Sequence, residues 1–274
     1  MSHRDKPTNG GTRMNDKEKY QFQKRFEQSM EQLAKTHERS KVYVDFMDYY
    51  IYKNSKSKDK TLPHGYTEKD MQIFHEAYNA FIQYNKAEIK EHGWYDYIGE
   101  YYEEYVLAGH KASTKGQYYT PRQISELISK TVGYNITMNE AYDPACGSAR
   151  NLLDYHSRNT GIRCTGEDID ESACKMAVIN FHLHGVDGVV NWIDALTREY
   201  MGVSWRILDG KIIITDMDWI RAVEDVRDAI SILSLSDETL ARILQKVSQT
   251  MPIEQEQDKS YTGGLDLWLH PNKT

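Results

Sequence analysis

The strongest constraint on the fold is an alternation of short extended and helical segments in the second half of the chain. Extended segments are predicted at 140–143, 162–166, 189–193 and 211–215, and helices at 150–157 and 171–184. An extended segment, a helix and another extended segment form a βαβ unit, which builds a parallel sheet. The carboxyl ends of parallel strands meet at one edge, where open α/β sheets bind ligands. We therefore expect a ligand site at this edge, near Asp143, Asp168, Asp194 and Asp216.

The first 110 residues show helical periodicity instead. Apolar residues recur at helical spacing in four stretches, which are Phe26, Met30 and Leu33; Val42, Phe46 and Tyr49; Met71, Phe74, Tyr78, Phe81 and Ile82; and Tyr95, Ile98, Tyr102, Tyr105 and Val106. Thr67 is a suitable N-cap for the third helix. Many of the 20 tyrosines lie here. They could stack on nucleic-acid bases, but amphipathic rings at helical spacing favour a small core.

These patterns predict an all-α domain followed by an α/β domain. The expected division is a flexible arm at 1–13, a helical domain at 14–112, an α/β domain at 113–250 and a polar tail at 251–274. Two helices are expected between 220 and 250. Further strands are not evident in the sequence, which leaves open whether the parallel sheet is complete.

A helix is also expected directly before the first strand. Thr120 is its predicted N-cap and Pro121 its first residue, and its apolar residues are Ile124, Leu127 and Ile128.

Composition excludes several classes of protein. No run of 18 apolar residues occurs and the N-terminus is polar, so we expect neither a membrane span nor a secretory signal, and a cytoplasmic location. Cys146, Cys164 and Cys174 lack C-x-x-C spacing, which predicts reduced thiols and no metal site.

The net charge of −7 argues against a generally basic nucleic-acid binder. Residues 1–60 nevertheless hold 14 Lys and Arg against 9 Asp and Glu, a net +5, whereas the remainder holds 20 against 32, a net −12. Electrostatic contact with DNA would therefore favour the N-terminal part, although a solvated helical face is the interpretation we favour for its lysines.

Two motifs lie where predicted strands end. In Asp143–Ser148 (DPACGS), Gly147 lets the backbone approach a ligand and Asp143 can bind a cationic group, although a simple tight turn also explains an isolated motif. In Gly166–Asp170 (GEDID), Asp168 follows at the spacing of roughly 20 residues typical of a ribose-binding carboxylate. Asp170 is a candidate N-cap for the next helix, which leaves Asp168 to face the ligand.

The order of the motifs resembles the N6-adenine DNA methyltransferases, in particular the modification subunits of type I restriction systems. The resemblance rests on Gly116–Pro121 (GQYYTP), Asp143–Ser148, Asp168, Asn180–Gly185 (NFHLHG) and Asp194–Leu196, and Trp94–Ala108 resembles the last helix of the N-terminal domain of these subunits. It implies a Rossmann-like methyltransferase domain that uses S-adenosylmethionine (AdoMet). It also implies DNA and a separate specificity subunit as partners.

The resemblance assigns cofactor contacts residue by residue. The residues are Tyr118 and Thr120 for the methionine moiety, Asp143 and Gly147 in the turn, Asp168 and Ile169 after the second strand, and Asp194 for the adenine. The family pattern has glycine after Ser148, where this chain has Ala149 and then Arg150. The arginine could crowd the cofactor, or its charge could pair with the cofactor's carboxylate.

The catalytic segment of the family, [DN]-P-P-[FYW], is altered in this chain. Asp216-Met-Asp-Trp219 stands in its place, so the resemblance makes Asp216 and Trp219 the catalytic candidates, with Trp219 stacking on a flipped adenine. Loss of both prolines leaves the loop less preorganised, and Asp218 adds negative charge where adenine must enter. Alternatively, Asp216 and Asp218 cap a helix at 219–230, and Trp219 packs in the core.

Two functions therefore stay open. The chain is either an active AdoMet-dependent DNA adenine-N6 methyltransferase, or a relative that binds cofactor, DNA or a partner without methyl transfer. A dinucleotide-dependent oxidoreductase ranks below both, because G-x-G-x-x-G is missing and residues 116–121 would go unexplained.

Overall fold

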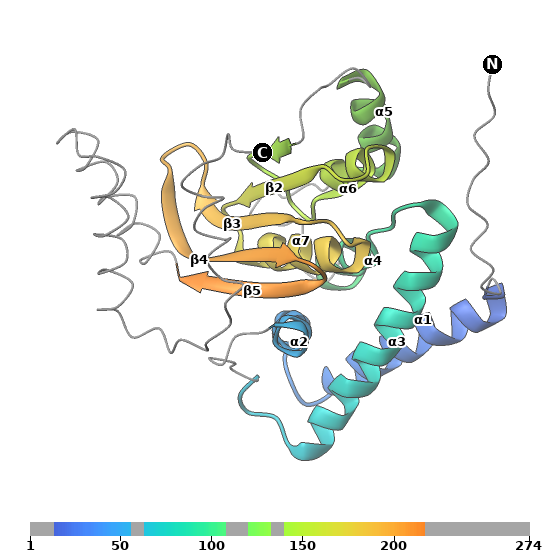
Figure 1. Ribbon diagram of the computed structural model, residues 1–274. Coiled ribbons are helices and arrows are strands. Elements are labelled where there is room, and N and C mark those ends of the chain that lie inside the picture. The colour runs from blue at the N-terminus through green and yellow to red at the C-terminus, as the bar shows by residue number, and fades with distance from the viewer. Residues whose placement is uncertain (1–13, 56–62, 108–119, 133–139, 217–274) are drawn as a thin grey trace. The chain divides into compact units, whose positions relative to one another are not determined.

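The computed structural model describes residues 14–55, 63–107, 120–132 and 140–216, and shows a group of helices followed by a five-stranded sheet (Figure 1). The helices are α1 (Asp16–Leu33), α2 (Arg39–Asn54), α3 (Glu68–His92), α4 (Tyr97–Tyr101), the π-helix η1 (Tyr102–Leu107), α5 (Arg122–Val132), α6 (Arg150–Arg158) and α7 (Glu171–His184). The strands are β1 (Glu140–Asp143), β2 (Arg163–Asp168), β3 (Gly188–Asp194), β4 (Glu199–Leu208) and β5 (Lys211–Asp216). The arm predicted at 1–13, the helices at 220–250 and the tail at 251–274 lie outside the described residues.

The sheet is mixed, with strand order β1-β2-β3-β4-β5. β1, β2 and β3 are parallel neighbours joined by α6 and α7, as the βαβ pattern predicts. Both crossovers run in the same direction across the sheet, so their right-handedness places α6 and α7 on one face. The strand predicted at 211–215 is β5, which runs in the same direction as β1–β3 but is not their neighbour. The strand β4, which was not predicted, lies between them and is antiparallel to both β3 and β5.

The turn between β4 and β5 explains this difference. Asp209 and Gly210 have φ angles of +49° and +66°, as a two-residue type I′ hairpin requires. This turn sends the chain straight back along β4, so no helical crossover separates the last two strands. Val203, Trp205 and Ile207 of β4 alternate with polar residues, which is the period of a strand with one covered face. Neither this turn nor this strand was predicted.

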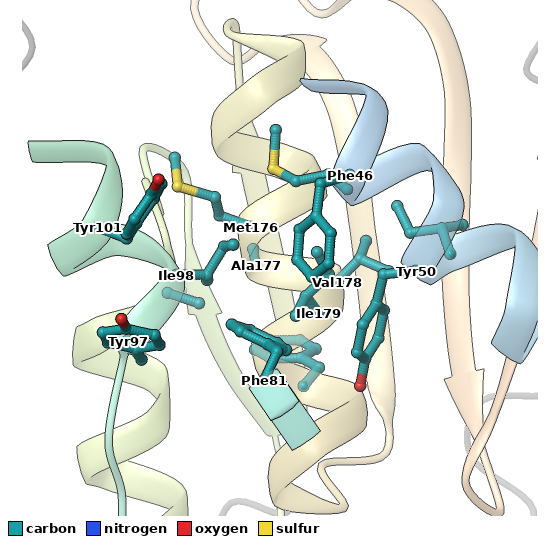
Figure 2. Packing of buried hydrophobic residues seen from close by; sticks show 14 of the residues in the cluster. Phe46, Tyr50, Phe81, Tyr97, Ile98, Tyr101, Met176, Ala177, Val178 and Ile179 are labelled. Atoms are coloured by element: carbon teal, nitrogen blue, oxygen red, sulfur yellow. The ribbon is translucent and has the colours of Figure 1, made fainter. Parts of the chain in front are cut away.

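Helix α7 lies at the centre of the core. Its residues are buried at every position from 173 to 181, which is typical of a helix covered on all sides. One side packs on the sheet, and the other faces α2, α3 and α4. Figure 2 shows this second contact, formed by Phe46, Tyr50, Phe81, Tyr97, Ile98 and Tyr101 of the helical part and Met176, Ala177, Val178 and Ile179 of α7. The helical part and the sheet therefore share one core.

Most of the predicted helices are confirmed. Phe26, Met30 and Leu33 are buried on α1, which begins with a capping box from Asn15. Thr67 caps α3 as predicted, and its side chain accepts a hydrogen bond from the backbone of Asp70. The prediction that the tyrosines form core is also confirmed among the described helices, where buried members are Tyr43, Tyr49, Tyr50, Tyr84, Tyr97 and Tyr101.

Two helix boundaries differ from the prediction. The segment from Tyr95 to Val106 was expected as one helix. It begins only at Tyr97, because Asp96 is the N-cap, and it becomes the π-helix η1 from Tyr102. Helix α5 begins at Arg122, and the carbonyl of Pro121 accepts the first helical bond, so Pro121 occupies the N-cap position expected for Thr120.

The apolar side of α5 faces away from the rest of the described protein. Ile124, Leu127 and Ile128 are 45%, 60% and 40% exposed. Ser125 and Ser129 are buried instead, on the side that packs against α6.

His184 joins the end of α7 to the helical part. Its Nε2 accepts a hydrogen bond from the backbone N–H of Tyr95 at 3.1 Å, and its Nδ1 lies 2.7 Å from the carbonyl oxygen of Asn180. Both contacts require a neutral ring with its proton on Nδ1. Burial lowers the pKa of His184 to about 4.

Folding is therefore expected to weaken as the solution becomes acidic. Between pH 6.5 and 4 the unfolded chain binds a proton at His184 that the folded protein does not, so stability falls as the pH is lowered through this range. From pH 7 to 5, His184 should account for a loss of about 2 kcal/mol in the free energy of unfolding. Urea titrations at both pH values should show a smaller loss in His184→Gln. An equal loss in the two proteins would contradict this assignment.

Candidate functional site

The turn after β1 is held by its own backbone and by β2. The Asp143 carboxylate accepts a hydrogen bond from the N–H of Ala145 at 3.1 Å, and the N–H of Cys146 donates to the carbonyl of Glu167 at 2.8 Å. Gly147 has φ +55°, a left-handed conformation that favours glycine. The turn therefore has a fixed shape at the carboxyl end of β1.

Asp168 ends β2 and faces this turn. Its Oδ2 accepts the N–H of Gly147 at 2.9 Å, and its Oδ1 accepts the N–H of Asp170, also at 2.9 Å. Burial raises the pKa of Asp168, although the two backbone hydrogen bonds act in the opposite direction. No Lys, Arg or His in the described part of the chain forms an ion pair with Asp143 or Asp168.

The residues after Asp168 have separate roles. Asp170 caps α7 through the N–H groups of Ser172 and Ala173, as predicted. Ile169 is 61% exposed, and its carbonyl accepts a hydrogen bond from Nε1 of Trp192 at 3.0 Å. The aliphatic side chain of Ile169 is therefore exposed to solvent at the edge where β1, β2 and β3 end.

Asp194 ends β3, the next strand of the sheet. Its Oδ1 accepts the N–H groups of Leu196 at 2.9 Å and Thr197 at 3.2 Å, and these bonds lower the pKa of Asp194. The side chain of Leu196 is 96% exposed beside it. Asp143, Asp168 and Asp194 thus end three adjacent strands, which lie about 4.8 Å apart in a sheet.

The backbone of Asp216, the catalytic candidate within the described residues, does not lie beside that of Asp143. β5 runs in the same direction as β1–β3, so Asp216 ends at the predicted edge. Four strand spacings nevertheless separate its backbone from that of Asp143, roughly 19 Å across the sheet. Trp219 and Tyr118 lie outside the described residues, and Thr120 contributes its carbonyl to a bond with Arg150.

Asp96 was not predicted, yet it connects the helical part to the turn. Its Oδ2 accepts hydrogen bonds from Oγ of Ser148 and Nε of Arg150, both at 2.6 Å. Its Oδ1 accepts from Nδ2 of Asn180 and the N–H of Gly99, both at 2.8 Å. The residue is 2% exposed. The sequence carries only one signal for Asp96, its position as an acid directly before a helix.

Arg150 points toward the helical part. In addition to Asp96, its guanidinium bonds Glu103 at 2.9 Å and the carbonyl of Thr120 at 3.3 Å. These carboxylates raise the pKa of Arg150 against the effect of burial. This arrangement differs from both sequence interpretations of the residue. The preceding Ala149 keeps a left-handed φ of +71°, although it is not glycine.

Glu167 forms a second unpredicted network. Its carboxylate accepts hydrogen bonds from the Tyr142 hydroxyl at 2.6 Å and from Arg198 at 2.7 Å. Arg198 follows the Asp194 turn, so the ion pair ties that turn to β2. Glu167 stands inside the GEDID motif, in which roles were predicted only for Asp168, Ile169 and Asp170.

Comparison with known proteins gives one match. Residues 93–219 match the family model described as N-6 DNA methylase. This segment of the chain is therefore similar to the N-6 DNA methylase family, and the helical part followed by a mixed α/β sheet is consistent with a methyltransferase fold. No curated protein and no solved structure matched the sequence. No helix in the described ranges is long and apolar enough to cross a membrane.

The network predicts unequal effects for the two carboxylates on Arg150. Asp96→Ala leaves a buried guanidinium with less compensation and should lower the free energy of unfolding by about 3–5 kcal/mol. Glu103→Ala, at the more exposed partner, should cost less than about 1 kcal/mol. Urea unfolding followed by circular dichroism measures both. Equal losses of unfolding free energy in the two variants would show that the burial of Asp96 does not determine its contribution to stability.

Proposed function

We propose that this chain binds AdoMet and acts as a DNA adenine-N6 methyltransferase-like protein. One observation carries the proposal: Asp143 and Asp168 flank the left-handed Gly147 at adjacent strand ends, and neither has a cationic partner in the described part of the chain. Carboxylates in this state favour a cationic ligand. AdoMet carries sulfonium and ammonium charges, a ribose diol and an adenine ring.

The hydrogen-bonding groups at the carboxyl ends of β1, β2 and β3 suit these groups of AdoMet. Each oxygen of Asp168 uses one lone pair for a backbone N–H, which leaves acceptor capacity for ribose hydroxyls. Asp143 offers its charge to the ammonium group. Ile169 and Leu196 flank the place proposed for adenine, and Asp194 stands beside them to recognise it. Tyr118 and Thr120 complete the set for the methionine moiety.

AdoMet supplies an electrophilic methyl group, and similarity to the N-6 DNA methylase family makes adenine N6 in DNA the proposed acceptor. We further propose the cytoplasm as location and a specificity-type subunit as partner, because the motifs resemble those of the modification subunits of type I restriction systems. No metal takes part in this proposal.

A second candidate function is AdoMet binding without methyl transfer. The strand order favours it, because Asp216 lies roughly 19 Å across the sheet from Asp143. Reacting atoms must come within about 3–3.5 Å of each other for transfer.

Calorimetric titration of the full chain with AdoMet tests the cofactor. We expect binding, and a loss of about tenfold or more in affinity in Asp168→Ala, because a charged acceptor is removed. Asp187→Ala is the matched control, since Asp187 precedes β3 at the opposite edge of the sheet. Absence of AdoMet binding, or equal losses in both variants, would contradict the proposed site.

Transfer of radiolabelled methyl groups to unmethylated DNA of varied sequence separates the two candidates. An active enzyme should label adenine N6, and Asp216→Ala should abolish labelling. AdoMet binding without labelling, with partner subunits co-purified, would favour the second candidate.

A further inference from the structure

Asn151 lies in the first turn of α6, directly after the turn that Asp143 begins. Its Nδ2 donates a hydrogen bond to Oδ2 of Asp143 at 3.4 Å. The other oxygen of that carboxylate accepts the N–H of Ala145. The amide and the carboxylate therefore lie side by side at the carboxyl end of β1.

The amide oxygen of Asn151 is buried and has no hydrogen-bond partner in the described part of the chain. A buried acceptor left unsatisfied is costly, and most such atoms in folded proteins have a partner. Reversing the amide would not help, because its oxygen would then face the Asp143 carboxylate. The orientation is thus fixed, with an acceptor left for a donor outside the described chain.

We propose that Asn151 Oδ1 and the Asp143 carboxylate together bind the ammonium group of AdoMet. This inference rests on the proposed cofactor. An ammonium group fits because it has three N–H donors and a positive charge, so it can bond a neutral acceptor and an anion at once. The sulfonium has no hydrogen to donate, and a ribose hydroxyl brings no charge to Asp143. Asn151 thereby helps to select a ligand with an amino-acid moiety.

If Asn151 had a purely structural role, that role would depend on its amide nitrogen and not on its amide oxygen. In that case Nδ2 would hold Asp143 in place, and Oδ1 would be incidental. Asn151→Leu removes both donor and acceptor at similar size, whereas Asn151→Asp removes the donor and keeps acceptors. The structural role predicts damage in both variants, and the ammonium contact predicts damage in the leucine variant alone.

The experiment compares AdoMet with 5′-methylthioadenosine, which keeps the adenine, ribose and sulfur but lacks the amino-acid moiety. Calorimetric titration of the full chain should show about tenfold or more loss of AdoMet affinity in Asn151→Leu, with methylthioadenosine unchanged. Asn151→Asp should keep AdoMet affinity within about threefold of the wild type. Asn159→Leu, at the other end of α6, is the matched control and should bind both ligands normally.

Several outcomes would overturn the inference. These are unchanged AdoMet affinity in Asn151→Leu, equal loss for both ligands, or equal loss in the leucine and aspartate variants. Circular dichroism checks folding, and Asn151→Ala replaces the leucine variant if that protein does not fold. If the wild type binds neither ligand, the proposed cofactor fails and this inference fails with it. If the wild type binds AdoMet but the variants disagree with expectation, only the role of Asn151 is lost.

Discussion

The buried carboxylate of Asp96 is the interaction on which the arrangement of the protein depends. Moving a charge out of water costs several kcal/mol of folding free energy unless hydrogen-bond donors surround it. The Asp96 carboxylate accepts hydrogen bonds from four donors on three separate elements. These elements are α4, the turn with its following helix α6, and α7. None of them can move away without leaving polar groups unpaired. The helical part therefore holds the proposed cofactor turn in place through the hydrogen bonds of Asp96.

Helix α7 completes this support through apolar packing. Because one side meets the sheet and the other meets α2, α3 and α4, its burial links the two parts of the chain in one core (Figure 2). Backbone amides then fix Asp168 and Asp194 at the edge, so the carboxylates are set before any ligand arrives. A site whose side chains are already fixed before the ligand binds loses less conformational entropy on binding. Among the described residues the Asp143 carboxylate has no cationic partner, and a cationic ligand would supply one.

The proposed cofactor site and the catalytic candidate Asp216 lie in different parts of the sheet. The three parallel strands and their acids form a continuous edge, whereas the hairpin of β4 and β5 carries Asp216 to the far side of the sheet. A two-residue turn at Asp209 and Gly210 replaces the crossover that a fourth parallel strand would need. The similarity of residues 93–219 to the N-6 DNA methylase family is thus compatible with a proposed cofactor site that is not adjacent to Asp216.

The sequence by itself determined what depends on near neighbours along the chain. Helical periodicity located α1–α3, local capping identified Thr67 and Asp170, and the spacing of short apolar runs located β1, β2, β3 and β5, because each signal repeats within a few residues. The Asp209-Gly210 turn was equally local and could have revealed β4. Only the tertiary structure decided the partners of Asp96, Arg150 and Asn151, and the position of β5 in the sheet. Asp96 bonds Ser148 and Asn180, which are 52 and 84 residues away along the chain. Periodicity in the sequence cannot predict which distant donor forms a hydrogen bond with a buried acceptor.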